Sequence, residues 1–491
     1  MAEKSVIVIG SGFAGLSAAS FMAKEGWKVT VIEKNETPGG RARQLKEKGF
    51  TFDMGPSWYW MPDVFERYFS QFGKKVSDYY TLHRLDPSYR IYWSDGYTDI
   101  PADFNELKNV FESIEPGSAV KLEKYLKGAF YKYQVGVNKL VYKPGRSLTE
   151  FMDWETISGV FKLQIFSSIK KHIAQYFKHP KLRQIMEFPV LFLGALPEDT
   201  PALYSLMNYA DIKGGTWYPS GGMYAVVNGM YKLAVELGVQ FRFNENVTAI
   251  IVEAGKAEKV VTNENTYSAD AVISGADYHF TETSLLPPAF QSYSEKYWNK
   301  RVMAPSCILY YVGLNRKLIN IEHHSLFFDV SFEEHGREIY KTKKWPDNPL
   351  FYLNVPSVTD PQTAPPGYEN LFFLIPVAAG LKGDDEKLRE QYFNLIVKRM
   401  EVLTGQSIID SIVYKKSYSV SNFVNDYNSF RGNAYGLANT LMQTAVLKPS
   451  CRSKKVKNLF YTGQLTVPGP GVPPSLISGE VVAKQVIKVL G

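Results

Sequence analysis

Residues 5–43, SVIVIGSGFAGLSAASFMAKEGWKVTVIEKNETPGGRAR, decide the fold of this chain. An apolar run at 6–9 meets a glycine-rich turn at 10–15, which opens a pattern with helical spacing. A second apolar run, 29–32, ends at Glu33. This order of strand, glycine turn, helix, strand and acid is typical of a dinucleotide-binding βαβ unit, so we expect an α/β fold of the Rossmann type.

Each glycine of the turn has a physical role in such a unit. Gly10 allows the tight turn, Gly12 lets the backbone approach a pyrophosphate, and Gly15 lets the helix pack closely on the sheet. The helix N-terminus offers free N–H groups to the phosphates, and Glu33 offers a carboxylate to the ribose hydroxyls. A structural turn without a cofactor is the alternative, because glycine-rich turns are common, but it leaves the acid unexplained.

Two further loops extend the predicted nucleotide site. Residues 38–43, PGGRAR, put bare backbone and a fixed cation, Arg41, near the nucleotide, and residues 53–57, DMGPS, follow soon after. Read alone, the first loop has a less favoured alternative, a surface loop with an exposed arginine.

The run GSGFAG…VIEKNETPGGRAR…GFTFDMGPS resembles the N-terminal signature of the FAD-dependent amine oxidase and phytoene desaturase superfamily. The resemblance implies that the nucleotide is FAD. The residues expected to bind it from these motifs are Gly10, Ser11, Gly12, Phe13, Ala14, Gly15, Glu33, Lys34, Gly40, Arg41, Ala42, Gly55, Pro56 and Ser57.

The C-terminal part supplies a second set of expected cofactor residues. A strand ending in Thr462-Gly463, a Pro/Gly loop and a terminal helix follow one another from residue 458 to 490. The resemblance implies that this segment returns to the flavin, with Val472 near the isoalloxazine and the helix N-terminus facing it. Apolar segments 239–251 and 271–277 are expected to be strands that return to the first sheet. The expected cofactor residues here are Val247, Gly275, Ala276, Asp277, Gly463, Gln464, Val472, Pro473 and Leu476.

Length and composition bound the remaining organisation. The 491 residues are 45% hydrophobic and 21% charged, which predicts two or three globular domains. The net charge of +7 favours an anionic membrane surface, whereas no basic run is dense enough to predict nucleic-acid binding. Two cysteines exclude a disulfide framework and indicate a reducing cytoplasm, and the scattered histidines predict no metal site.

No part of the sequence predicts a membrane-crossing helix, but one part predicts surface attachment. The first strand starts too early to leave room for a signal peptide, and no apolar run reaches the roughly 18–20 residues of a spanning helix. Residues 148–193 combine an apolar stripe with interleaved lysines, as in helices that lie in a membrane interface. An ordinary helical domain with a solvated basic face is the alternative. The stripe and its cations are Phe151, Trp154, Ile157, Val160, Phe161, Ile165, Phe166, Lys162, Lys170, Lys171, Lys178, Lys181 and Arg183.

These patterns predict three domains. The FAD-binding domain is assembled from the discontinuous segments 1–78, 222–283 and 450–491. A substrate-binding domain with a mixed or antiparallel sheet comprises 79–103 and 284–449, and a helical, membrane-associating subdomain comprises 104–221.

Two later motifs, WYPSGGMYAVVNGM and VPGPGVPPSLISGE, are similar to those of bacterial carotenoid desaturases of the phytoene desaturase family. The resemblance implies removal of two hydrogens from neighbouring sp³ carbons of a long apolar polyene, with flavin N5 as hydride acceptor. It also implies a cytoplasmic enzyme bound peripherally to the inner face of the membrane. Related desaturases often have Ala and Ile where this chain has Pro470 and Val472, and Gly where it has Pro474, which leaves the flavin contacts of this loop open.

The sequence identifies no catalytic side chain. Glu150 and Asp153 are carboxylates near the predicted membrane segment that could accept a proton, but ordinary surface roles explain them better. An amine oxidase, a carotene isomerase or saturase, and a non-enzymatic carrier of prenylated proteins remain alternatives on the same fold. The substrate (phytoene, a partly desaturated carotene, or a 1-hydroxylated carotenoid desaturated at C3–C4) and the electron acceptor, oxygen or a quinone, stay open. Trp58, Tyr59, Trp60 and Trp217 are candidates for lining a substrate tunnel, but packing in the core explains them equally well.

Overall fold

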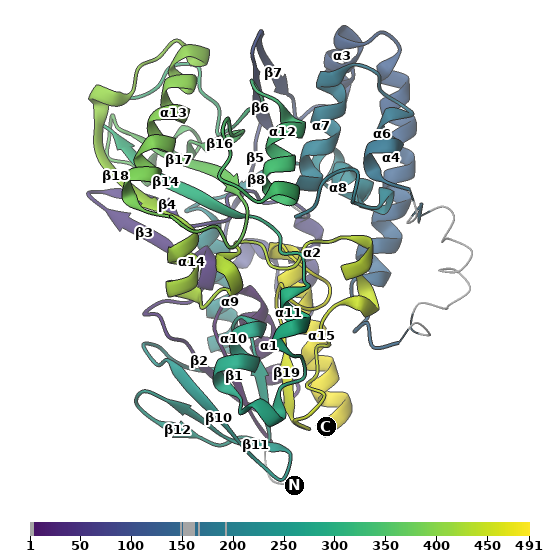
Figure 1. Ribbon diagram of the computed structural model, residues 1–491, viewed down its shortest axis with the longest axis vertical. Helices are drawn as coiled ribbons and strands as arrows, with labels where there is room; N and C mark the ends of the chain where they lie inside the picture. Colours follow the sequence, from purple (N-terminus) through teal and green to yellow (C-terminus); the bar gives the residue numbers. More distant parts are fainter. Residues whose placement is uncertain (1–3, 148–149, 151–162, 165–166, 192–193) are drawn as a thin grey trace.

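The computed structural model describes residues 4–147, 150, 163–164, 167–191 and 194–491. Two large sheets lie at opposite ends of the molecule, and a group of helices packs beside the upper one in Figure 1. Both chain termini lie at the lower end, next to the first sheet (Figure 1). The fold is therefore of the α/β class that the glycine motif predicts.

The lower sheet is parallel and contains the predicted βαβ unit. Its strand order is β19-β13-β1-β2-β9, and every neighbouring pair is parallel. Strands from the beginning, middle and end of the chain thus meet in one sheet. Its elements are β1 (Ser5–Ile9), α1 (Phe13–Lys24), β2 (Lys28–Ile32), α9 (Met223–Glu236), β9 (Gln240–Arg242), β13 (Ala271–Ser274), β19 (Leu459–Tyr461) and α15 (Val472–Leu490).

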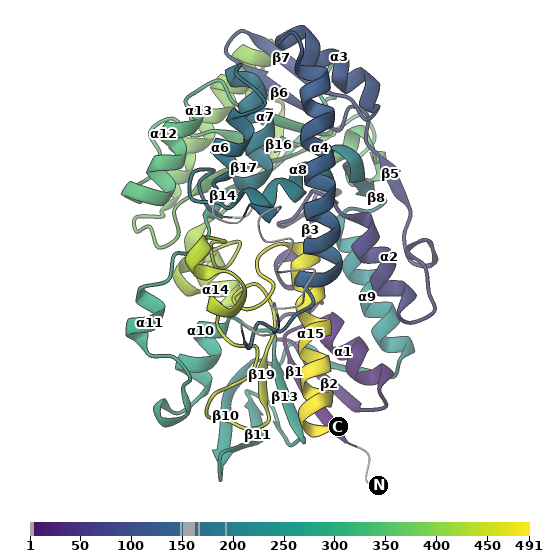
Figure 2. The ribbon, with the colours of Figure 1, turned by 90° about the vertical axis from the view of Figure 1, so that its right-hand side faces the viewer.

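Small residues set the packing around this sheet. A Cβ on Gly15 would lie 2.0 Å from the carbonyl oxygen of Gly10, so helix α1 can approach β1 only with glycine here. A Cβ on Gly479 would lie 2.5 Å from the carbonyl oxygen of Ala14, where α15 packs against α1. Figure 2 shows these two helices side by side. The chain ends are therefore held together by backbone contact at glycines.

One strand departs from the prediction. Gln240–Arg242 and Ala271–Ser274 join the first sheet as expected, but the segment beginning at Val247 does not. It forms β10 (Val247–Glu253), which pairs antiparallel with β11 (Lys256–Thr262) and then β12 (Thr266–Tyr267) in a separate sheet. The alternation of this segment suits a half-exposed hairpin, whereas the parallel sheet is buried on both faces.

The upper sheet is mixed, as predicted for the second domain. Its order is β18-β14-β17-β16-β15-β6-β7, and all pairs are antiparallel except β6 with β15. All nine residues of β14 are buried, and α13 (Glu386–Thr404) covers one face. The strands are β6 (Tyr89–Trp93), β7 (Gly96–Ile100), β14 (Ser306–Leu314), β15 (His324–Phe327), β16 (Phe351–Asn354), β17 (Glu369–Val377) and β18 (Ile412–Tyr418).

Short helices and hairpins complete the scaffold. A hairpin of β3 (Gln44–Glu47) and β4 (Phe50–Asp53) follows the βαβ unit, and β5 (Leu82–Arg84) pairs with β8 (Trp217–Pro219). The short helices are α2 (Pro62–Ser70), α10 (Tyr278–Phe280), α11 (Glu295–Asn299), α12 (Phe332–Arg337) and α14 (Val420–Tyr427).

The helical region contains α3 (Phe104–Ile114), α4 (Ser118–Val135), α6 (Ile169–Ala174), α7 (Pro180–Leu191) and α8 (Leu206–Tyr209). The predicted apolar stripe (Phe151, Trp154, Ile157, Val160, Phe161, Ile165, Phe166), Lys162 and Asp153 lie outside the described residues. Of the predicted basic face, Lys170 pairs with Glu333 and Lys181 with Asp95. Among the helices within the described ranges, none is long and apolar enough to cross a bilayer. The three-domain division stays a prediction.

Asp53, at the end of β4, links the β3–β4 hairpin to the N-terminus of helix α9. Its carboxylate accepts hydrogen bonds from the backbone N–H groups of Met223 (2.6 Å) and Tyr224 (3.1 Å), at the N-terminus of α9. A Cβ on Gly222 would lie 2.3 Å from Asp53 Oδ2, so only glycine leaves room for this cap. Burial raises the pKa of Asp53 to about 7.

The raised pKa of Asp53 predicts a pH-dependent stability. In the unfolded chain the pKa is near 3.9, so between about pH 4 and pH 7 the folded state binds more protons, and stability falls as the pH rises through this window. Asp53→Asn removes this contribution. The difference in Tm, wild type minus Asp53→Asn, is therefore expected to decrease from pH 4 to pH 7, as measured by thermal unfolding. A difference that does not change with pH would contradict the prediction.

Candidate cofactor and substrate cavity

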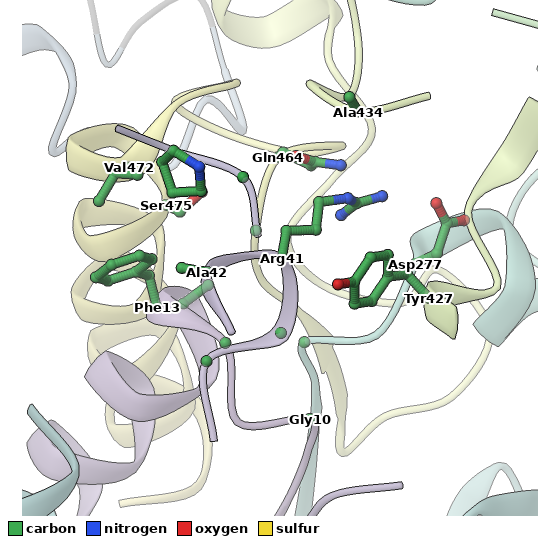
Figure 3. A pocket seen from close by; sticks show the side chains of 18 of the residues that line it. Gly10, Phe13, Arg41, Ala42, Asp277, Tyr427, Ala434, Gln464, Val472 and Ser475 are labelled. Atoms are coloured by element: carbon green, nitrogen blue, oxygen red, sulfur yellow. The ribbon is translucent and has the colours of Figure 1, made fainter. Parts of the chain in front are cut away.

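One cavity of about 380 Å³ lies between the two sheets. Its floor comes from the ends of β1 and β2 and from the glycine turn, and its opposite wall comes from β14, β16 and β17 of the upper sheet. The C-terminal loop 462–475 closes a third side. The N-terminal turn and the start of α15 therefore face the same space (Figure 3).

Nearly all residues that the sequence predicts to bind the cofactor line this cavity. Ser11 and Leu476 do not line it. Those that do are Gly10, Gly12, Phe13, Ala14, Gly15, Glu33, Lys34, Gly40, Arg41, Ala42, Gly55, Pro56, Ser57, Val247, Gly275, Ala276, Asp277, Gly463, Gln464, Val472 and Pro473. Segments far apart in the sequence thus meet at one place, although which atoms hold FAD stays a prediction.

Glycines leave the floor of the cavity bare. Gly10, Gly40 and Gly463 have φ values of 90°, 54° and 108°, which favour glycine. Gly12 has ordinary dihedrals, but a Cβ there would meet nothing within 4 Å and would point into open space. At Gly12 the requirement for glycine is therefore space for a ligand and not backbone strain.

Glu33 is held firmly at the end of β2. Its Oε2 accepts from the backbone N–H (2.8 Å) and the hydroxyl (2.7 Å) of Ser11, and its Oε1 accepts from the backbone N–H (3.0 Å) and side-chain amide (2.8 Å) of Asn35. These four bonds occupy the lone-pair positions of the carboxylate. Ribose hydroxyls would bind by displacing the Ser11 hydroxyl or the Asn35 amide. Ser11, which lies outside the lining, thus orients the predicted ribose acid.

Arg41 is a buried cation in the middle of the cavity. Its guanidinium donates to the Ser429 hydroxyl (2.9 Å) and the Asn433 carbonyl (3.2 Å), and with the amide of Gln464 turned toward it, to Gln464 Oε1 (2.7 Å). Figure 3 shows it projecting between Gln464 and Tyr427. Burial lowers the pKa of Arg41, partly offset by Asp277. A buried guanidinium of this kind suits an anionic ligand group.

Asp277 has a structural role that the sequence alone did not reveal. Its carboxylate accepts from the backbone N–H groups of Phe280 (3.2 Å) and Phe430 (3.1 Å). Burial raises its pKa, while these bonds and Arg41 lower it. Asp277 therefore connects the turn after β13 to loop 428–434 beside Arg41.

The N-terminus of α15 carries few backbone donors. The helix begins at Val472, and Pro473 and Pro474 occupy its first turn, where proline is tolerated because the N–H would have no helical partner. The N–H of Ser475 already donates to the Gly471 carbonyl (3.0 Å). Among these first-turn residues, Val472 alone has an uncommitted N–H for a ligand, in addition to the positive end of the helix dipole. The unusual prolines thus fit the helix but reduce its donors.

Sequence reasoning missed much of the apolar end of the cavity. Trp58 and Trp60 line it as expected, but Tyr59 is fully buried against Phe65 and Trp217 lies outside the lining. Tyr59 and Trp217 are therefore wrong as lining candidates. The wall is completed by Met61, Met207, Cys307, Leu309, Tyr352, Leu374, Ala434 and Tyr435. The strand residues among these have no local motif, because only the sheet topology brings them to the cavity.

The residues present fit FAD. Bare glycine backbone, a helix N-terminus and a buried arginine suit the nucleotide and diphosphate, and the aromatic wall suits a flat apolar ring. Cys451 does not line the cavity. Nowhere in the part of the chain that the structure describes do three or more His, Cys, Asp or Glu residues form a metal-binding group.

A family model described as flavin containing amine oxidoreductase matches residues 13–487. The chain belongs to this family. The chain is 42% identical to a carotenoid 3,4-desaturase of Haloarcula japonica, and the match covers 99% of each chain. It is 30% identical to a zeta-carotene-forming phytoene desaturase of Myxococcus xanthus, and this match covers 99% of this chain and 94% of the relative. Among solved structures, it resembles an oxidoreductase from Methanosarcina mazei with a TM-score of 0.64 and 15% identity, over 98% of this chain and 100% of the other. The protein is an FAD-dependent oxidoreductase, as the N-terminal motif predicts.

Proposed function

We propose that this flavoenzyme is a carotenoid desaturase that introduces a C=C bond at C3–C4 of an acyclic, 1-hydroxylated carotenoid. The observation that carries the proposal is the continuity of one cavity from the glycine cradle to an aromatic wall on the upper sheet. This continuity places an apolar, aromatic surface beside the predicted flavin site, which suits a long apolar substrate. The similarity to a carotenoid 3,4-desaturase over both full lengths favours this bond over the others.

Bound FAD supplies a hydride acceptor, which is needed because an allylic C–H is not appreciably acidic. The chain supplies binding, orientation and exclusion of water. Trp58, Trp60 and Leu374 present apolar surface to the polyene, and Arg41 holds the anionic part of the cofactor. The oxidised carotenoid leaves with one more conjugated double bond, and the electrons pass to oxygen or a quinone.

Two alternatives are disfavoured by specific observations. An amine oxidase would bind a cationic substrate, yet the wall formed by β14, β16 and β17 presents no acidic side chain to the cavity. A non-enzymatic carrier of prenylated proteins would not require the intact glycine cradle. An isomerase or saturase would use the same cavity, and the assay must distinguish it by product.

In the assay, purified protein is loaded with FAD and mixed with liposomes. It is then incubated separately with three polyenes: phytoene, γ-carotene and a 1-hydroxylated acyclic carotenoid. We expect the hydroxylated carotenoid to yield a red-shifted product that is two hydrogens lighter by mass spectrometry. A product of unchanged mass would indicate an isomerase, and a heavier one a saturase. Conversion of phytoene alone would assign an earlier desaturation step.

We further propose that the protein works in the cytoplasm, attached to the inner face of the membrane. Its substrate dissolves in lipid, and the net charge of +7 favours anionic lipids. Met442 and Leu447 are 71% and 46% exposed, in a segment that packs beside Gly145, which precedes the predicted membrane segment in the sequence. Exposed apolar side chains next to an apolar-basic segment suit insertion between lipid headgroups.

Replacing both Met442 and Leu447 by serine is therefore expected to lower the affinity for anionic vesicles about tenfold, because two apolar side chains lose their burial in lipid. Vesicle flotation measures this. The matched control replaces Ile319 and Val402, which are 76% and 75% exposed near the upper sheet, by serine. Equal loss of binding in both double variants would contradict attachment through the 441–447 segment.

A further inference from the structure

A polar cluster, Ser57–Tyr352–His324, interrupts the apolar wall of the cavity. The hydroxyl of Tyr352 lies 2.9 Å from Ser57 Oγ and 2.6 Å from His324 Nδ1. Ser57 and Tyr352 line the cavity, whereas His324 lies behind them and is fully buried. Trp58 packs against His324 and Tyr352, and Leu374 is the neighbour of Tyr352 on the next strand. Other apolar side chains that line the same cavity are Trp60, Met207 and Leu309.

The cluster is rigid and uncharged. The indole of Trp58 stacks on the His324 ring, with ring centroids 4.1 Å apart and an interplanar angle of 7°. Burial lowers the pKa of His324 well below its usual range and raises that of Tyr352, so both groups are neutral at physiological pH. A neutral cluster suits a neutral polar group of the substrate and not an acid or an amine.

The cluster retains hydrogen-bonding capacity toward the cavity. A hydroxyl group has one donor and two acceptor positions, so Tyr352 keeps one position after its contacts with Ser57 and His324. Ser57 Oγ keeps further positions. The tautomer of His324 decides whether the Tyr352 hydroxyl donates to Nδ1 or accepts from it. In both cases a ligand hydroxyl, which can donate and accept, can form a further hydrogen bond with Tyr352 or Ser57.

The position of the cluster matches the chemistry of 3,4-desaturation. Gly55 packs directly on the loop that carries Arg41, because a Cβ on Gly55 would lie only 2.5 Å from the Arg41 carbonyl oxygen. Ser57 comes two residues after Gly55, so the cluster lies close to the predicted nucleotide site. In a 1-hydroxylated carotenoid only one methylene separates the hydroxyl-bearing carbon from the C3–C4 bond. A hydroxyl that is recognised must therefore lie beside the reacting atoms, and this cluster lies in the cofactor cavity itself.

We propose that Tyr352, held by His324 and Ser57, is the specificity-determining residue that hydrogen-bonds the substrate hydroxyl next to the bond to be desaturated. This inference rests on the proposed function. Recognition works mainly by exclusion: a polyene without the hydroxyl would cover Tyr352 and Ser57 with hydrocarbon and leave their hydrogen-bonding positions unmet.

The test compares two polyenes that differ only in a hydroxyl or a hydrogen at C1. The readout is the ratio of their kcat/KM values in one enzyme preparation, which is independent of the active fraction and of FAD occupancy. Wild type is expected to prefer the hydroxylated polyene, and Tyr352→Phe is expected to lower the ratio about tenfold. Quenching of tryptophan fluorescence by the polyenes gives the corresponding Kd ratio without turnover.

Tyr59→Phe is the matched control, because it also removes a buried tyrosine hydroxyl, bonded to Tyr80 at 3.0 Å, but outside the cavity. It is expected to leave the ratio unchanged. If Tyr352→Phe fails to fold, Ser57→Ala tests the same cluster with the Tyr352–His324 bond intact, and it should lower the ratio too.

The outcomes separate this inference from the proposed function. An unchanged ratio in the cluster variant, or a wild-type enzyme that desaturates both polyenes equally well, would overturn the role of Tyr352 and leave the desaturase standing. A wild-type enzyme that desaturates neither polyene would overturn the proposed function and the inference with it.

Discussion

Replacing Gly12 by valine is expected to give a folded protein that has lost nearly all of its affinity for FAD. A Cβ on Gly12 meets no protein atom within 4 Å, so the side chain costs the apoprotein little and occupies the space above the cradle. We expect FAD affinity to fall about a thousandfold or more, which corresponds to about 4 kcal/mol. Equilibrium dialysis against FAD measures this loss, and thermal unfolding should show that FAD raises the Tm of wild type but not of the variant.

Gly128→Val is the control for the valine itself. Gly128 lies on the exposed face of α4, where a Cβ also meets nothing within 4 Å. It should bind FAD like wild type after a small loss of helix stability. If Gly12→Val retains FAD, the glycine turn does not hold the pyrophosphate.

Arg41→Gln is expected to weaken FAD binding about a hundredfold. The change removes a buried charge that has room to bond an anion, and charge-assisted hydrogen bonds contribute about 3 kcal/mol at most each. Fluorescence titration of the apoprotein with FAD gives the Kd. The dependence of Kd on salt should be weak, since Arg41 is buried.

Arg43→Gln is the matched control two residues away. Arg43 pairs with Asp426 at 3.0 Å and does not line the cavity. Its replacement should change the Kd for FAD less than threefold, within about 0.7 kcal/mol. If both substitutions raise the Kd for FAD equally, Arg41 contributes only to the overall positive charge near the site and does not hydrogen-bond FAD directly.

The sequence predicts well what local pattern determines. The βαβ unit from Ser5 to Ile32 follows from the glycine turn between two apolar runs, and α15 follows from the Pro/Gly loop before an apolar helix. That β19, the strand before α15, joins the sheet of the βαβ unit is predictable only from the family resemblance, because no local signal in residues 458–490 specifies a strand beside β13.

The remaining site depends on topology. Leu309, Tyr352 and Leu374 lie on separate strands of the upper sheet and reach the cavity because β14, β17 and β16 are neighbours. Their sequences read only as buried strands. The prediction that the segment from Val247 joins the first sheet is wrong for a related reason, since a short apolar run is compatible with either a parallel strand or a hairpin.

Some predicted residues carry more than one role. The sequence predicts that Glu33 and Asp277 bind the cofactor, yet both carboxylates also accept hydrogen bonds from backbone N–H groups of the protein. A carboxylate at the edge of a sheet can orient a loop and bind a ligand at once, and sequence alone does not separate these functions.

The proposed desaturation requires that two electrons pass from the polyene to the bound flavin. The most direct measurement mixes FAD-loaded enzyme anaerobically with a 1-hydroxylated acyclic carotenoid and follows both chromophores in a single turnover. We expect the loss of the oxidised-flavin band to match, mole for mole, the appearance of a red-shifted polyene. A polyene that changes without loss of the flavin band, or a flavin reduced by an amine while the polyene is untouched, would contradict it.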